Sequence, residues 1–221
     1  VAAIWVVHPL TTQSVTYIVQ RAESMMALGF LAAWYWLIRG ATSDRAWPWY
    51  LGSMLAVWLA LGCKEVAAMA PLVFLLYDRA FLSTSWAQAW RQRWAPYTGM
   101  ICSWAALAFL IANTPDFASG AGFSYDRITP AEYAATQPAV ILHYLSLVVW
   151  PDPLCFDYWW PVSRTPSAIA GPAAALLVLL ALTAWLVWKH PRLGFPLAAV
   201  FLILAPTSSI VPIADPAFEQ R

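Results

Sequence analysis

The chain alternates between long apolar runs and short polar breaks, a pattern typical of membrane-spanning helices. The apolar runs cover residues 24–38, 47–62, 66–82, 94–112, 139–150, 169–188 and 193–204. Since a helix needs about 20 residues to cross the hydrocarbon core, the pattern predicts an all-α integral membrane bundle with about six full spans. Residues 1–7 are expected to form a partial first span. The run 139–150 is short for a span, so a re-entrant or interfacial helix is expected there.

The polar breaks between the runs predict the turns. The runs 47–62 and 66–82 are separated only by Cys63-Lys64-Glu65, which predicts a helical hairpin with these three residues at its tip. Residues 83–93 are predicted to form a polar loop that carries Arg91 and Arg93. The longest polar stretch, 113–138, is predicted to be a loop as well.

Composition agrees with a membrane protein and excludes several function classes. Hydrophobic residues make up 62% of the chain and charged residues only 10%, whereas a soluble domain carries about 25% charged residues. The net charge of +1 suggests no nucleic-acid partner. The three cysteines are isolated from one another and from histidines, so no disulfide framework, metal site or cofactor is expected.

Two islands of charge lie between apolar runs, Arg21-Ala22-Glu23 and Cys63-Lys64-Glu65. An ionised side chain near the middle of a bilayer costs about 2.5–3.5 kcal/mol on insertion scales. A membrane protein therefore keeps such residues mainly where they face water, a partner or a substrate. The two islands are the first candidates for a functional site.

The distribution of basic residues predicts the orientation in the membrane. Seven of the twelve lysines and arginines lie in three breaks that the helix order places on one side, with only two of the eleven acids. These seven are Arg39, Arg45, Arg79, Arg91, Arg93, Lys189 and Arg192. Cytoplasmic loops are enriched in Lys and Arg, so this side is expected to be cytoplasmic.

The same helix order gathers several polar groups on the opposite, outer side. They are His8, the two charged islands, the loop 152–160 and the chain end 219–221. Structural polar residues scattered along a chain would not be expected to sort in this way. The prediction requires that residues 139–150 do not cross the membrane.

Four groups of residues, taken in order, resemble one protein family. The first two groups are His8-Pro9-Leu10 with Val15-Thr16-Tyr17-Ile18 and Arg21-Ala22-Glu23, and Cys63-Lys64-Glu65-Val66 with Ala70-Pro71-Leu72-Val73 and Leu76-Tyr77-Asp78. The other two are Tyr144-Leu145 with Trp150-Pro151, Pro153-Leu154 and Asp157-Tyr158, and Pro206-Thr207-Ser208-Ser209 with Pro212-Ile213 and Phe218-Glu219-Gln220-Arg221. Together they resemble the membrane part of the transmembrane, TPR-containing O-mannosyltransferases and their bacterial relatives.

The resemblance implies a GT-C glycosyltransferase fold. Members of the family transfer a sugar from a polyprenyl-phosphate donor on the non-cytoplasmic side, and the eukaryotic ones mannosylate Ser and Thr of proteins. Tetratricopeptide repeats normally follow the membrane part, and the catalytic acid normally lies in the first outer loop. Residues 1–221 are accordingly expected to be part of a single GT-C-like domain, without its first outer loop, its last spans or the repeats, and inactive alone.

The outer-side cations are the candidates for binding the donor phosphate, with the resemblance adding weight to each. Lys64 can bind phosphate as a point charge and Arg21 can bind it bidentately. Histidine can donate a hydrogen bond or shuttle a proton near neutral pH. The candidate phosphate ligands are Lys64, Arg21, Arg221 and His8. Each has a structural alternative, such as a snorkelling Lys64 paired with Glu65, an interfacial Arg21–Glu23 salt bridge, or a His8 that satisfies a helix-terminal carbonyl.

Carboxylates and aromatic rings on the same side are the candidates for contacting sugar or acceptor. They are Glu23, Glu65, Asp157, Tyr158 and Glu219. Rings stack on the C–H faces of sugars and acids accept hydrogen bonds from hydroxyls. The aromatic residues around Asp157 equally suit the aromatic belt of a membrane interface.

Three functions remain open at this point. The first is inverting transfer of a mannose-type sugar from a polyprenyl-phosphate donor to Ser/Thr hydroxyls of an acceptor polypeptide, in the bacterial inner membrane or the endoplasmic reticulum. The second is a transporter or lipid flippase, since intramembrane charge and proline-interrupted helices suit a solute path. The third is a non-catalytic membrane scaffold that presents a TPR domain.

Overall fold

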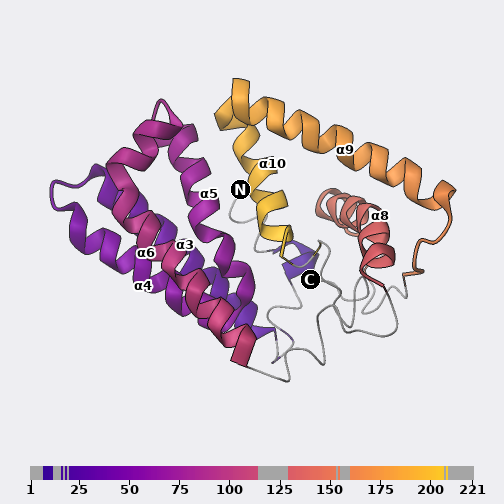
Figure 1. Ribbon diagram of the computed structural model, residues 1–221, viewed down its shortest axis with the longest axis horizontal. Coiled ribbons are helices and arrows are strands. Elements are labelled where there is room, and N and C mark those ends of the chain that lie inside the picture. Colours follow the sequence, from indigo (N-terminus) through magenta and orange to yellow (C-terminus); the bar gives the residue numbers. More distant parts are fainter. Residues whose placement is uncertain are drawn as a thin grey trace. The chain divides into compact units, whose positions relative to one another are not determined.

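The computed structural model describes residues 7–11, 16, 18, 20–113, 129–152, 154, 160–206 and 208, and within them it contains helices and turns but no strand (Figure 1). The elements are the short helix η1 (Pro9–Thr11), α3 (Arg21–Thr42), α4 (Ala46–Cys63), η2 (Glu65–Met69), α5 (Ala70–Tyr77), η3 (Asp78–Leu82), α6 (Trp86–Asn113), α8 (Pro130–Val149), α9 (Pro166–Lys189) and α10 (Pro191–Leu204). The expectation of an all-α chain is confirmed for these residues.

The helices group into two compact units. The larger unit contains Arg21–Asn113 and Thr183–Pro206, and so holds α3 to α6, the last part of α9, and α10. The smaller unit contains the other described residues, including α8 and the first part of α9. Each unit is described by itself below.

The α3–α4 hairpin is the most closely packed part of the larger unit, and small residues make that approach possible. A Cβ atom on Gly29 would lie 3.0 Å from the Cβ of Ala60 and 3.2 Å from the carbonyl oxygen of Ala56. The buried hydroxyl of Ser53 donates a 2.6 Å hydrogen bond to the carbonyl oxygen of Ala33. Small residues and short polar contacts of this kind are how membrane helices come close together.

Residues 65–82 run as one helical stretch whose hydrogen-bond pattern changes twice. The 3₁₀ turn η2 leads into the α-helix α5, and the π-type turn η3 ends with the Ser83 amide donating to the carbonyl oxygen of Asp78 at 2.7 Å. Pro71 lies in the first turn of α5, where its missing N–H costs no helical hydrogen bond. The predicted single span 66–82 is therefore a segmented helix, and the predicted hairpin with α4 has Lys64 at its tip.

The helix α6 begins earlier than the sequence pattern predicted. Residues 86–93 were expected to belong to a polar loop, and they form its first turns. The helix bends at Arg93, whose φ of −132° and ψ of 29° are not helical. Pro96 follows three residues later, and because its ring would clash with the carbonyl group four residues before it, the helix cannot continue straight.

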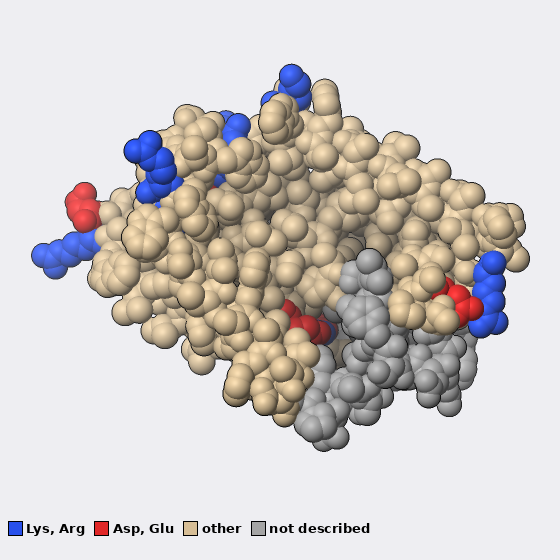
Figure 2. Space-filling model, in the orientation of Figure 1, with Lys and Arg blue, Asp and Glu red and all other residues tan. Residues whose placement is uncertain are grey.

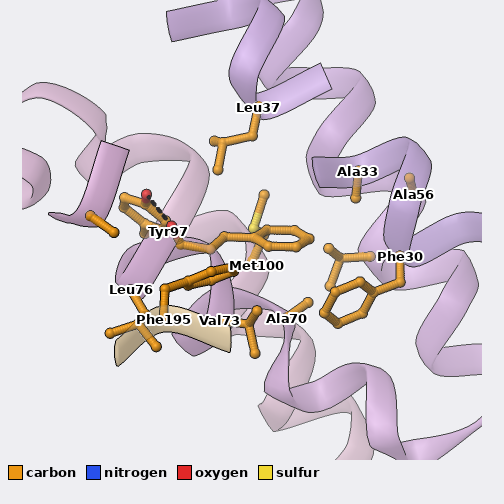
Figure 3. Packing of buried hydrophobic residues seen from close by; sticks show 13 residues of the cluster. Phe30, Ala33, Leu37, Ala56, Ala70, Val73, Leu76, Tyr97, Met100 and Phe195 are labelled. Carbon is orange, nitrogen blue, oxygen red and sulfur yellow. Dashed lines mark hydrogen bonds between the residues drawn. The ribbon is translucent and has the colours of Figure 1, made fainter. Parts of the chain in front are cut away.

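The core of the larger unit lies between its helices (Figure 3). Its buried members are Phe30, Ala33, Leu37, Ala56, Val57, Ala70, Val73, Phe74, Leu76, Ala80, Tyr97, Met100 and Phe195. Phe195 of α10 packs edge-on against Trp34 and Tyr77, with ring centroids 5.5 Å apart in both pairs. Aromatic pairs in this arrangement join α10, which comes late in the sequence, to α3 and α5.

In the smaller unit, α8 starts within the polar stretch that was predicted to be a loop. A capping box fixes its start: the Thr129 hydroxyl accepts a 3.2 Å hydrogen bond from the Glu132 amide, and the Glu132 carboxylate accepts one from the Thr129 amide. The helix is 20 residues long instead of the 12 of the apolar run 139–150. At about 1.5 Å per residue, it is about 30 Å long.

Three described helices are long and apolar enough to cross a membrane: α4, α6 and α9. The helix α10 is apolar but shorter, with 14 residues. Exposed large apolar side chains are numerous, and on the face seen in Figure 2 charged side chains are few. These features indicate a helical membrane protein, while the expected six spans and the GT-C fold stay predictions.

Candidate functional site

The two charged islands meet in the larger unit. The Lys64 ammonium donates to the Glu23 carboxylate, forming an ion pair across 41 residues of sequence. Each of the two side chains is 21% exposed. Glu23 lies in the first turn of α3, and Lys64 directly follows α4. Because the two helices run antiparallel, the pair lies at the end of the hairpin opposite the turn 43–45.

The backbone at Lys64 explains how its side chain reaches α3. Lys64 is extended, with φ −159° and ψ 139°, between two helical segments. Its amide still donates a 3.0 Å hydrogen bond to the carbonyl oxygen of Ala60, and its own carbonyl oxygen accepts one of 3.2 Å from the Ala67 amide. Because both backbone groups are satisfied, the break in the helix carries little hydrogen-bonding penalty.

Arg21 and Glu65 flank the ion pair. Arg21 is the exposed first residue of α3, and Glu65 is the half-buried first residue of η2. Neither forms an ion pair within the described part of the chain. The four side chains therefore place two cations and two carboxylates at one end of the helices, with Arg21 available to an external anion.

An apolar groove runs between α3 and α4 and ends at this charged site. Its volume is about 570 Å³. Along one wall lie Met25, Leu28, Gly29, Ala32 and Trp36 of α3, and along the other Gly52, Leu55, Ala56, Leu59, Ala60 and Cys63 of α4. Cys63 directly precedes Lys64, so the groove and the ion pair are continuous.

The opposite end of the larger unit is rich in arginine, as the sequence pattern predicted. The turn 43–45 between α3 and α4 and the turn 83–85 before α6 both lie at this end, because residues 65–82 run back from the end of α4 and α6 runs antiparallel to them. The antiparallel direction follows from two contacts: Arg93 binds Asp78, and the indole N–H of Trp104 donates a 2.7 Å hydrogen bond to the Ala68 carbonyl. Arg192, at the start of α10, reaches the same end, where its Nε donates to the carbonyl oxygen of Ala80.

A buried ion-pair network at the arginine-rich end was not predicted from the sequence. The Asp78 carboxylate is fully buried and accepts hydrogen bonds from Arg93 Nε at 2.6 Å and from Arg93 Nη2 at 2.8 Å. The hydroxyls of Ser83 and Tyr97 donate to the same carboxylate at 2.6 and 2.8 Å. Arg93 was predicted to lie in a polar loop, and this prediction is wrong: Arg93 is buried within α6, and the network joins η3 to the bend in that helix.

The signal that could have revealed this network is weak but present. Pro96 three residues after Arg93 marks a bend in an apolar helix, and Tyr97 supplies a hydroxyl one turn after Arg93. A bidentate arginine–carboxylate pair with two further hydroxyl donors satisfies every acceptor site that burial would otherwise leave unpaired. Its completeness indicates a structural role and not a substrate site.

The remaining predicted site residues lie elsewhere. His8 belongs to the smaller unit, where its Nε2 donates a 3.2 Å hydrogen bond to the carbonyl oxygen of Val148 in the last turn of α8. This contact is the helix-terminal arrangement that was the structural alternative for His8. Asp157, Tyr158, Glu219 and Arg221 lie outside the described residues. In the described part of the chain, no three His, Cys, Asp or Glu side chains gather in a group that could hold a metal ion.

Comparison of this chain with models of known protein families, with curated protein sequences and with solved structures found no match. The geometry of the charged site and its groove, together with the sequence pattern, is therefore the basis for the functional conclusion.

Proposed function

We propose that the protein is a membrane glycosyltransferase that moves a mannose-type sugar from a polyprenyl-phosphate donor to Ser/Thr hydroxyls of a polypeptide on the non-cytoplasmic face. The observation that carries the proposal is the Glu23–Lys64 ion pair, which brings the two charged islands of the sequence to one end of the hairpin. The resemblance of the surrounding motifs to the O-mannosyltransferase family adds the reaction type.

In this proposal, the cations of the site stabilise the leaving phosphate. The acceptor oxygen attacks the sugar carbon, its proton passes to a carboxylate base, which the family resemblance places in the first outer loop, and the bond from the sugar to the phosphate oxygen breaks. Negative charge then grows on the polyprenyl phosphate. Arg21 and Lys64 neutralise it, and stabilisation of charge that develops in the transition state is usually the largest catalytic contribution. Glu23 holds Lys64 in position and Glu65 accepts hydrogen bonds from sugar hydroxyls.

The charge distribution supports this orientation of the site. The end of the larger unit that carries the turns 43–45 and 83–85 holds the arginines other than Arg21, and the ion pair lies at the other end. By the positive-inside rule, the arginine-rich end faces the cytoplasm and the site faces outward. In a variant whose three native cysteines are replaced by serine, a membrane-impermeant thiol reagent should label Ser24→Cys from the outer side and Ser43→Cys only from the cytoplasmic side. Labelling of both from one side would contradict this orientation.

A transport path has less support within the described residues. Arg21, Glu23 and Lys64 lie at helix ends, and the Asp78–Arg93 pair is closed by its own hydrogen bonds. A transporter would more typically place half-helix ends and charges near the midplane, open to a solute.

Sugar transfer tests the proposal directly. Membranes containing the full-length protein would be supplied with labelled polyprenyl-phosphate mannose and a Ser/Thr-rich peptide. Transfer of label to the peptide is expected, and Lys64→Ala should raise the KM for the donor at least tenfold. Arg45→Ala, which removes an exposed cation at the opposite end, is the matched control and should leave the KM unchanged.

A third variant distinguishes a purely structural role of the ion pair from binding of the donor phosphate by Lys64. Glu23→Gln breaks the same pair but keeps the lysine. If Lys64 binds the donor phosphate, Glu23→Gln should affect the donor KM much less than Lys64→Ala does. Equal effects of the two variants, or the absence of any transfer by the unaltered protein, would overturn the proposal.

A further inference from the structure

We propose that the groove between α3 and α4 holds the hydrocarbon chain of a single polyprenyl phosphate, with the phosphate at Arg21 and Lys64. The inference rests on the proposed function for the class of donor, and it adds where in this chain the donor lipid lies. It also assigns a role to an apolar surface that the ion pair alone does not explain.

The groove has the dimensions of a binding site for one chain. From Gly52 to Cys63 it follows about 16 Å of the α4 axis, at about 1.5 Å per residue. Its volume of about 570 Å³ falls within the range of about 300–1,000 Å³ that is usual for ligand pockets. Small residues at Gly29, Ala32 and Gly52 leave the space, and leucines and Trp36 form its sides.

The position of the groove matches an amphipathic ligand with one charged end. Its lining is almost entirely apolar along its length, and it reaches the charged site at Met25, two positions after Glu23, and at Cys63, next to Lys64. A hydrocarbon chain lying in the groove would therefore place its headgroup beside the two cations.

Charge complementarity specifies the headgroup. Lys64 already balances Glu23, while the exposed Arg21 has no ion-pair partner among the described residues. An anion bound by Arg21 would also attract Lys64, and guanidinium groups bind phosphate oxygens bidentately. A phosphate monoester or diester on one chain fits this arrangement, whereas a two-chain phospholipid would have to leave one chain outside this groove.

Cys63 offers a direct readout, and Cys102 offers its control. Cys63 is a half-exposed free cysteine at the headgroup end of the groove, and Cys102 is an exposed free cysteine of α6 that does not line the groove. The detergent-solubilised full-length protein would be alkylated with a small maleimide, with and without undecaprenyl phosphate, and the modification of each cysteine followed by mass spectrometry. We expect the lipid to slow alkylation of Cys63 several-fold and to leave Cys102 unchanged.

A pair of variants tests the groove itself. Ala32→Phe fills the groove at mid-length, and Ala105→Phe adds the same side chain at an exposed position of α6 outside it. Protection of Cys63 by undecaprenyl phosphate should be lost in Ala32→Phe and kept in Ala105→Phe. Both variants should be compared at matched thermal stability, so that a loss of protection reports on the groove and not on unfolding.

Several outcomes would overturn the inference. The first is resistance of Cys63 to alkylation without lipid, which would show that another part of the protein covers the groove. The second is equal protection of Cys63 and Cys102 by the lipid. The third is protection of Cys63 by phosphatidic acid that is as strong as protection by undecaprenyl phosphate. Protection of Cys63 without any sugar transfer would support the lipid site and contradict the proposed function. Sugar transfer without protection of Cys63 would support the proposed function and contradict the lipid site in the groove.

Discussion

The carboxylate of Glu23 and the ammonium of Lys64 form an ion pair that joins the start of α3 to the residue that follows α4. Both side chains are mostly shielded from solvent, and each belongs to a different charged island of the sequence. The pair thus joins the ends of the two helices and also contains Lys64, a candidate ligand of the donor phosphate.

Reversing the pair should separate its structural contribution from its chemical one. Glu23→Lys or Lys64→Glu alone is expected to lower the free energy of unfolding by about 1 kcal/mol or somewhat more, because the pair is only partly buried. The double variant restores the opposite charges and should recover most of that loss. Thermal unfolding in detergent, analysed as a double-mutant cycle, measures this coupling. No recovery in the double variant would show that the two side chains do not depend on each other.

Removing Arg93 should be far more damaging than removing its neighbour. Arg93→Ala leaves the buried Asp78 carboxylate without its bidentate partner, and breaking such a pair costs about 3–5 kcal/mol. Arg91→Ala removes an exposed arginine of the same helix and should change stability by less than about 0.5 kcal/mol. Thermal unfolding of the two variants side by side is the measurement. Similar melting temperatures would show that the Asp78 network contributes little.

Acid should weaken the start of α8. The Thr129 amide donates to the Glu132 carboxylate and Arg164 pairs with it at 2.9 Å, and together these lower the pKa of Glu132 below its ordinary value. A carboxylate whose pKa is lowered on folding contributes stability above its unfolded pKa, and loses it as the pH falls through the folded pKa. Unfolding temperature should therefore fall on acidification below about pH 4.3, the ordinary value for Glu.

The Glu132→Gln variant is the control for this pH dependence. Glutamine keeps the shape of the side chain but does not titrate, so the part of the acid-induced loss that comes from Glu132 should vanish. If the wild-type protein and the variant lose stability in parallel as the pH falls, Glu132 is not the titrating group.

Two glycines should respond to alanine in opposite ways. A Cβ on Gly194 would lie 2.7 Å from the carbonyl carbon of Leu186, a backbone atom that cannot move aside, so Gly194→Ala should force α10 away from α9 and destabilise the larger unit. Gly62, near the end of α4, has no atom within 4 Å of that position. Gly62→Ala should stabilise by about 0.5 kcal/mol through the lower entropy of the unfolded chain. Unfolding temperatures of the two variants, shifted in opposite directions, would bear this out.

The hydrophobic pattern alone predicted the parts of the fold that depend on length and apolarity. The runs 47–62 and 169–188 correspond closely to α4 and α9, and a tip at Lys64 followed from its position between two runs. Charge sorting predicted the arginine-rich end of the larger unit. These features are set by the bilayer, which acts on every residue in the same way.

The hydrophobic pattern of the sequence could not predict which distant residues form pairs. Nothing local indicates that Lys64 contacts Glu23 and not the adjacent Glu65, because the choice depends on how close the small residues of α3 and α4 allow the helices to come. The burial of Arg93 was missed because an arginine in a polar stretch is usually solvated. Only the three-dimensional arrangement of Asp78, Ser83 and Tyr97 makes that burial favourable.

Closure of the α3–α4 hairpin at both ends has a mechanical consequence. A short turn at residues 43–45 joins the helices at one end, and the Glu23–Lys64 pair joins them at the other. Because both ends are joined and small residues pack the helices closely between them, we expect the hairpin to move as one unit. Bending within the larger unit is then expected outside the hairpin, in the stretch 65–82, where the helical winding changes from 3₁₀ to α to π within eighteen residues, and at the bend of α6 at Arg93.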